Sequence, residues 1–124
     1  MAAVNPEVID DYHVVHRLED LPLAVQFELK ATPMADAGGS YQVGCVVRGE
    51  PLPLSRLIFA AVSPLHRHCL VHYESGGFAH TYSVKHFVFD ANQAELLEET
   101  YVPQKYADLE ELLAAIKSGI FQEG

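Results

Sequence analysis

The chain is short of basic residues. Its 124 residues include 8 Lys and Arg against 17 Asp and Glu, which gives a formal charge of −9 at neutral pH. This balance provides no electrostatic attraction toward a phosphate backbone or an anionic membrane surface. We therefore expect neither nucleic acid nor a membrane among its partners.

Cysteine is also scarce, because Cys45 and Cys69 are the only two in the sequence. Two widely spaced cysteines are too few for a disulfide framework or a cysteine zinc knuckle. Each lies in an apolar pattern typical of a strand. We interpret both as buried thiols rather than as redox groups or nucleophiles.

Long hydrophobic runs are missing as well. The longest strongly apolar stretch, residues 57–62, is far shorter than the roughly 20 residues that a membrane-spanning helix needs. The N-terminal residues do not show the basic segment and apolar run of a secretory signal. The sequence also lacks internal repeats and low-complexity segments. These features predict a single cytoplasmic domain comprising residues 1–124.

The charges that are present are unevenly distributed. Residues 1–39 carry a net charge of −5, residues 40–89 a net charge of +2 and residues 90–124 a net charge of −6. The middle segment also contains five of the seven histidines. Because histidine titrates near pH 6.5 or so, this segment becomes strongly positive in mild acid while both ends stay negative. One hypothesis is therefore a histidine surface that responds to pH.

The apolar pattern predicts five or six consecutive strands. Residues 23–29 alternate apolar and polar side chains, as residues 41–48 do, which predicts two half-buried strands that form a hairpin. Residues 56–62 are apolar on both sides, which is typical of a central strand. Further strands are predicted at 66–74, 78–90 and 93–102, the first two joined by a hairpin turn at Ser75-Gly76-Gly77.

Helix signals occur at both ends of the sequence. Asp108 and Glu111 form a capping box ahead of a helical apolar stripe, and Gly119 fits a Schellman stop, so a helix is predicted over 108–118. Asn5-Pro6 resembles a helix start, but β-branched residues leave 6–19 as either helix or extended chain. The predicted fold class is α+β: a curved antiparallel sheet of five or six strands with the C-terminal amphipathic helix packed on one face and, in the helical alternative for 6–19, a second helix at the N-terminus.

The hairpin at 66–86 contains most of the histidines, and their faces depend on its register. A three-residue loop places His72 opposite His80 and brings all five histidines of the segment to one face. In that register His66, His68 and His86 form a three-nitrogen site for a divalent metal such as zinc.

A two-residue loop, Ser75-Gly76, or a four-residue loop with the same pairing, gives the opposite arrangement. It pairs Val71 with His80 and Cys69 with Tyr82, and it separates apolar from polar side chains more completely. We favour this register, because an antiparallel sheet commonly has one solvated face. The histidines are then solvated strand residues, with His80 partly buried, and Glu74 is an exposed residue beside the turn.

No motif in the sequence is specific enough to name a reaction or a ligand. We expect a non-enzymatic binding or self-assembling domain without a cofactor, whose partner is a second copy or another protein. The alternative is a histidine-based, metal-dependent enzyme or a small-ligand-binding protein that uses the 66–86 hairpin. The candidate ligand-binding residues are His66, His68, His72, His80 and Tyr82, and the candidate metal ligands are His66, His68 and His86.

Overall fold

The computed structural model describes residues 5–43, 52–77 and 79–121. Within these ranges the sheet has the order β1-β3-β4-β5-β6, with β2 also paired to β3. All pairs are antiparallel except the short β2–β3 pair, which is parallel. The α+β prediction is confirmed. The elements in chain order are η1 (Pro6–Val8), β1 (His13–Val15), η2 (Leu18–Asp20), α1 (Leu23–Leu29), β2 (Met34–Ala35), β3 (Ser55–Ser63), β4 (His68–Ser75), β5 (Thr81–Phe89), β6 (Ala94–Val102) and α2 (Leu109–Lys117).

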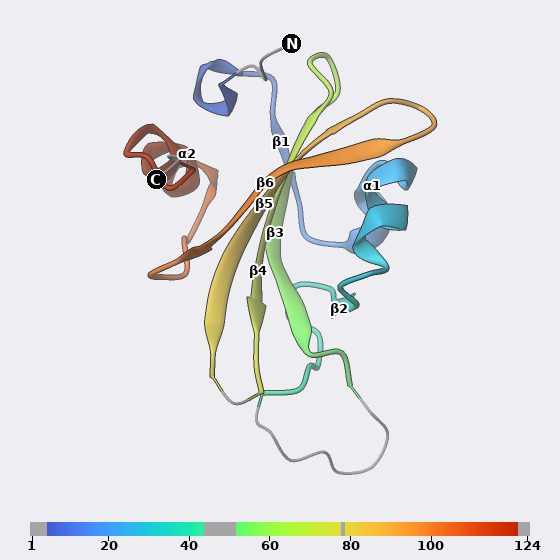
Figure 1. The fold of residues 1–124 in the computed structure, drawn as a ribbon, viewed down its shortest axis with the longest axis vertical. Helices are drawn as coiled ribbons and strands as arrows, with labels where there is room; N and C mark the ends of the chain where they lie inside the picture. Colours follow the sequence, from blue (N-terminus) through green and yellow to red (C-terminus); the bar gives the residue numbers. More distant parts are fainter. Residues whose placement is uncertain (1–4, 44–51, 78, 122–124) are drawn as a thin grey trace.

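The sheet lies between two helices, α1 on one face and α2 on the other (Figure 1). Val25 and Leu29 of α1 pack in one core with Val71 of β4. Leu112 of α2 packs in a second core with Leu70 of the same strand. Because consecutive strand residues point to opposite faces, a single strand supplies both cores.

The C-terminal helix forms where it was predicted. Asp108 caps it by accepting a hydrogen bond from the Glu111 backbone N–H at 3.0 Å. The Glu111 carboxylate accepts from the Ala107 backbone N–H, one residue earlier than in a standard capping box. At the other end Gly119 adopts a φ of 102°, and the Ile120 N–H donates to the Ala115 carbonyl, which completes the predicted Schellman stop.

The strand predicted at 23–29 is wrong, because this segment is the helix α1. Its alternating pattern also satisfies a helical one: Leu21, Val25 and Leu29 are spaced by four residues, and all three are buried. Leu23 and Phe27, which alternation had placed on the buried face, are 79% and 66% exposed.

The structure also differs from the predictions for the N-terminal segment and for residues 41–48. The N-terminal helix is reduced to the 3-10 turn η1, capped by Asn5, and the extended alternative is confirmed by β1. The strand predicted at 41–48 lies mostly outside the described residues. Residues 41–43 are not in a strand, and the hairpin with 23–29 cannot form because that partner is helical.

The β4–β5 hairpin has neither predicted register. Its loop spans 76–80, and His72 pairs with Val84. The pairing is shifted by four residues from the register with a three-residue loop. Because this shift is even, His68, His72 and His86 share one face, as they do in that register. The favoured register, with a two-residue loop, is wrong. The loop is held by other segments: Gly76 donates to the Leu54 carbonyl, and a side chain at Gly76 would lie 1.9 Å from the Gln42 carbonyl oxygen.

The other strand predictions are confirmed. β3 is a central strand, with most of its side chains buried on both faces. β6 begins one residue after the predicted start of the last strand. Cys69 is a free, fully buried thiol, as expected, whereas Cys45 lies outside the described residues. In the described part of the chain, no helix has the length and apolar character needed to cross a membrane.

Candidate functional site

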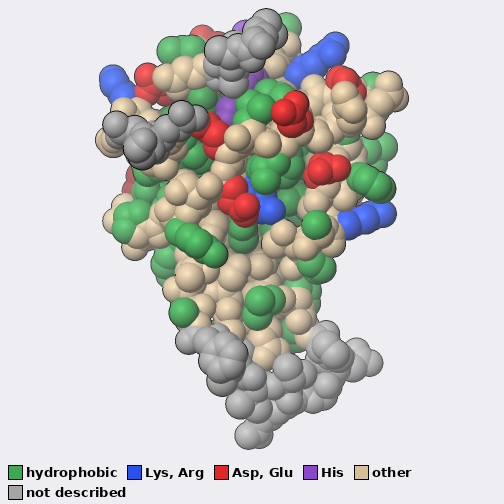
Figure 2. All heavy atoms as spheres, in the orientation of Figure 1, with side chains coloured by type: hydrophobic (Ala, Val, Ile, Leu, Met, Phe, Trp, Pro, Cys, Tyr) green, Lys and Arg blue, Asp and Glu red, His purple; other side chains and the backbone are tan. Residues whose placement is uncertain are grey.

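Three histidines are buried on the α2 face of the hairpin. The exposed fractions of His68, His72 and His86 are 3%, 0% and 0%. The rings of His72 and His86 contact Tyr106 and Phe121, which lie on the α2 side of the sheet. On the face shown in Figure 2, histidine reaches the surface only in small areas. The prediction of solvated side chains is therefore wrong for these three histidines.

His68 and His86 contact each other directly. Nδ1 of His68 lies 2.7 Å from Nε2 of His86, and Nδ1 of His86 lies 3.4 Å from a carboxylate oxygen of Glu98. Because a carboxylate only accepts, His86 donates from Nδ1 and accepts from His68 at Nε2. Burial lowers the pKa of His86 to about 4, and burial together with the neighbouring His86 lowers the pKa of His68. The three side chains form a chain of hydrogen bonds between two neutral rings and a carboxylate.

His72 has a partner at each ring nitrogen. Its Nδ1–H donates to the Ser83 carbonyl at 2.9 Å, and its Nε2 accepts from the Tyr106 backbone N–H at 3.0 Å. These partners fix the neutral tautomer, because a protonated Nε2 cannot accept. Burial lowers the pKa of His72, and the charge of Lys105 lowers it further. His72 thus links β4 to β5 and to the connection between β6 and α2.

His66 pairs with Asp11 rather than with His68 or His86. It lies in the turn between β3 and β4, and its Nδ1 is 3.1 Å from a carboxylate oxygen of Asp11, which also accepts from the Ser63 hydroxyl. The structure therefore brings together two of the three predicted metal ligands, His68 and His86, and pairs His66 elsewhere. Among the described residues, no group of three or more His, Cys, Asp or Glu is placed to hold a metal ion.

His80 and Tyr82 lie at the loop end of the β4–β5 hairpin, around Glu74. The rings of His80 and Tyr82 are 5.0 Å apart, and Nε2 of His80 lies 2.9 Å from one Glu74 carboxylate oxygen. Arg56 donates to the other oxygen from Nε at 3.1 Å, and the Tyr41 hydroxyl donates to the first at 3.2 Å. Burial alone would raise the pKa of Glu74, but hydrogen bonds from His80 and Arg56 hold it below the ordinary value.

Glu74 is only 4% exposed, so its prediction as an exposed turn residue is wrong. Arg56, which sequence reasoning did not select, is its direct partner across the β3–β4 pair. An opposite-charge pair of this kind is visible in a sequence only when the register is known. Tyr41 lies in a segment without regular structure, so no pattern in the sequence indicates its contact with Glu74.

A polar hollow of about 320 Å³ opens beside Glu74. Arg56 and Glu74 form part of its lining, together with His16 and Lys105 from two other segments. Apolar residues of β3, Phe59 among them, complete this wall. The volume lies at the lower end of the range of about 300 to 1,000 Å³ that is usual for small-ligand sites.

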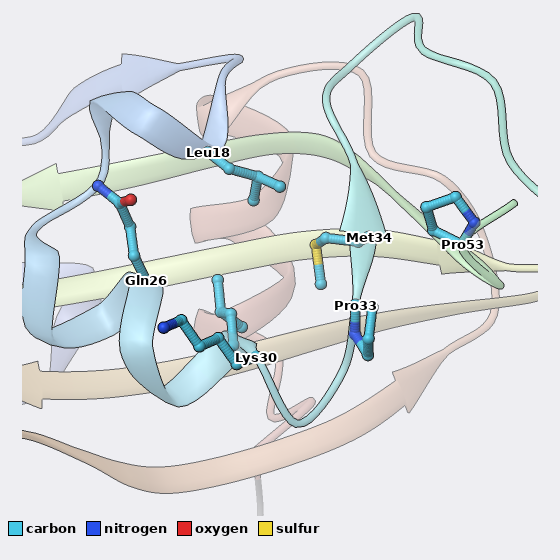
Figure 3. Close-up of a pocket in the computed structure, with 7 residues that line it drawn as sticks. Leu18, Gln26, Lys30, Pro33, Met34 and Pro53 are labelled. Carbon is cyan, nitrogen blue, oxygen red and sulfur yellow. The ribbon is translucent and has the colours of Figure 1, made fainter.

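A second hollow, of about 370 Å³, lies on the α1 side of the sheet (Figure 3). Leu18 and Met34 point into the space between η2, α1 and β2. Gln26 forms a fixed part of the wall, because its amide donates to the Leu21 carbonyl at 2.7 Å. Lys30 lies at the edge. The apolar side chains that line this hollow are Leu18, Leu29, Pro33, Met34 and Pro53.

The chain matches no known protein family, no curated protein and no solved structure.

Proposed function

We propose that this chain is a non-enzymatic binding domain and that its ligand places an apolar group in the hollow beside α1. The observation that supports this most directly is the hollow itself, in which five of the seven lining residues are apolar. Its volume of about 370 Å³ suits a small ligand. An apolar group that enters gains free energy by removing apolar surface from water.

The charge at the edge of the hollow indicates the other part of the ligand. Lys30 is the charged residue among the seven that line it. Its ammonium group lies 5.3 Å from the centre of the Phe27 ring, and Phe27 is 66% exposed. A cation on the solvent side can pair with an anionic group while the apolar part of the ligand is buried. The ligand class is therefore an apolar molecule with an anionic end.

The buried histidines provide a less suitable binding surface. Both ring nitrogens of His72 have protein partners, and His68 and His86 bond to each other. A ligand that used these nitrogens would first have to break hydrogen bonds that hold the sheet to its neighbours. Such buried, partnered groups support a structural role for this cluster.

An environment-sensitive dye with the same chemistry tests the proposal. Anilinonaphthalene sulfonate, which is apolar and anionic, is titrated into the full chain, and its fluorescence and the melting temperature of the protein are measured. We expect saturable enhancement in the wild-type protein and its loss in Leu18→Gln, which places an amide in the apolar wall. The matched control is Leu65→Gln, because Leu65 is 77% exposed and does not line the hollow.

The outcomes separate the proposal from nonspecific dye binding. Loss of binding in Leu18→Gln with full binding in Leu65→Gln supports it. Equal binding by both variants would place the dye elsewhere and reject this hollow as the ligand site. Failure of the folded wild-type protein to bind the dye would reject the proposed ligand class.

A histidine-based, metal-dependent enzyme is the second candidate, and the contact between His68 and His86 is the observation that favours it. This candidate expects zinc to raise the melting temperature of the wild-type protein and His68→Ala to abolish that rise. A wild-type protein whose melting temperature does not change when zinc is added would exclude it.

Self-association and a cytoplasmic location belong to the same proposal. Leu23 and Phe27, one turn apart on α1, are 79% and 66% exposed, and a second copy would bury them favourably. Light scattering of the wild-type protein and of Phe27→Glu tests this point. A strict monomer at high concentration would remove self-association from the proposal.

A further inference from the structure

The polar hollow next to Glu74 is formed by segments that are far apart in the sequence. His16 follows β1, Gly38 follows β2, Arg56 lies on β3, and Lys105 lies in the connection between β6 and α2. This hollow is separate from the apolar hollow beside α1, because the two have no lining residue in common.

Arg56 has donors left over for a ligand. Its Nε and Nη2 both contact one carboxylate oxygen of Glu74, and its Nη1 donates to the Gly39 carbonyl at 3.1 Å. A guanidinium carries five N–H groups, so these three contacts do not exhaust its donors. The Arg56 side chain is 27% exposed, and it stacks over the Tyr41 ring at 4.4 Å. The guanidinium is thus held in place at the wall of the hollow.

Glu74 does not cancel the positive charge available to a ligand. Its carboxylate already accepts hydrogen bonds from Arg56, Tyr41 and His80, and it is almost fully buried. Glu74 also lines the hollow, but these donors already occupy its carboxylate oxygens, so the unused N–H groups of Arg56 are available to an anion.

Lys105 supplies a second cation, from the connection between β6 and α2. It is exposed, and within the described ranges it forms no ion pair. It lies near His72, where its charge adds to the effect of burial in lowering the pKa of that ring. The net charge of −9 of the whole chain does not prevent anion binding here, because salt screens charges more than about 10 Å away at 0.1 M ionic strength.

We propose that this hollow binds a small organic anion, with the carboxylate or phosphate group held between Arg56 and Lys105. Phe59 and Ala107 add apolar wall beside the two cations, so the anionic group carries a short apolar part. A carboxylate and a phosphate monoester share this chemistry, since each presents several acceptor oxygens to Arg. The site is additional to the binding function proposed above.

Titration of three probes that share a phenyl ring tests the proposal. Benzoate, phenyl phosphate and neutral benzamide are added to the full chain, and binding is followed by calorimetry and by NMR. We expect both anions to bind more tightly than benzamide, with affinity that falls as salt is raised. Benzoate binding tighter than phenyl phosphate assigns the site to carboxylates, and the reverse order assigns it to phosphate monoesters.

Variants of exposed lysines identify the site without disturbing Glu74. Lys105→Gln should weaken anion binding about tenfold, which corresponds to the loss of one charge-assisted hydrogen bond. The matched control Lys117→Gln, on the last turn of α2, should leave it unchanged. Lys30→Gln should weaken the dye at the apolar hollow and leave benzoate unaffected, so failure of one proposal is distinguishable from failure of the other.

Two results would overturn the anion site. One is benzamide binding as tightly as benzoate and phenyl phosphate, which would remove the role of charge. The other is Lys105→Gln binding the anions as well as Lys117→Gln does, which would place the anions elsewhere on the surface.

Discussion

The two faces of the sheet bury their side chains in different ways. On the α2 face, His68, His72 and His86 are almost inaccessible, and each is hydrogen-bonded to a protein group. On the α1 face, the contacts of Val25 and Leu29 with the strands are apolar, and a hollow of about 370 Å³ lies beside them. The α2 face thus adds hydrogen-bonded buried histidines to its apolar core around Leu112, whereas Val25 and Leu29 hold α1 to the other face by apolar packing.

This difference bears on which groups are free to accept a ligand. A buried polar atom needs its partner in a fixed position, because an unpaired one costs about 1 to 3 kcal/mol. The histidine cluster therefore leaves little freedom to rearrange around a ligand. An apolar wall imposes no such requirement, and it can accept a ligand without losing hydrogen bonds. We therefore assign a structural role to the histidine cluster, and we propose the apolar hollow beside α1 as a ligand site.

The largest expected effect comes from placing a charge under α2. Leu112 is fully buried, and Leu112→Asp puts a carboxylate in its core with no cation to pair with, so we expect a loss of more than about 4 kcal/mol. Circular dichroism and thermal melting should show an unfolded protein or a detached helix. Glu110→Ala, on the exposed side of the same helix, is the control, and an unchanged melting temperature in Leu112→Asp would contradict the packing described.

His72→Ala tests whether the histidines hold the α2 face. The Tyr106 backbone N–H loses its acceptor, and a cavity forms in the sheet, so we expect a loss of about 3 to 4 kcal/mol of unfolding free energy. Urea denaturation measures this loss. The exposed His13→Ala serves as control, and a comparable midpoint for the two variants would argue against the structural role.

Acid should lower the stability of the α2 face, which contains His86. The pKa of His86 falls from 6.5 to about 4 on folding, so the folded protein binds fewer protons than the unfolded chain between these values. The stabilising contribution of neutral His86 is complete above its unfolded pKa and is lost as the pH falls toward 4, by about 3 kcal/mol. Denaturation at several pH values should show this slope, reduced in His86→Gln and retained in His13→Gln. A slope unaffected by His86→Gln would disprove the assignment.

The smallest change in stability is expected on the α1 face. Leu18 is partly buried at the wall of the hollow, so Leu18→Gln should cost about 1 kcal/mol or less. The same variant should nevertheless lose dye binding, which separates binding from stability on this face. Destabilisation as large as that of His72→Ala would show that the hollow is part of the tightly packed core.

Local signals in the sequence were sufficient to predict some helices and strands. The cap at Asp108, the apolar stripe and Gly119 all lie within one helix, so α2 could be predicted from its own residues. Residues 23–29 were ambiguous, because seven apolar-rich residues fit both a strand and a short helix. Burial of Leu21, Val25 and Leu29 against the sheet decides for the helix, and this contact is not visible in the local pattern.

The candidate site depended on contacts that are distant in the sequence. The hairpin loop bonds to residues 43 and 54 rather than to itself, so its length could not be inferred from Ser75-Gly76-Gly77. The histidines are buried because Tyr106 and Glu98 approach from elsewhere in the chain. These histidines share one face, as in the register with a three-residue loop and not as in the favoured one. Apolar patterning alone does not predict that a histidine is buried with a hydrogen-bond partner.

The most direct test of the two-face account is an NMR titration with anilinonaphthalene sulfonate that follows both faces at once. The sequence contains only two methionines, so selective labelling gives a simple methyl spectrum in which Met34 reports on the hollow. The account predicts that the Met34 methyl signal shifts in a saturable way while the ring signals of His72 stay in place. Shifts of the His72 ring without any change at Met34 would contradict it.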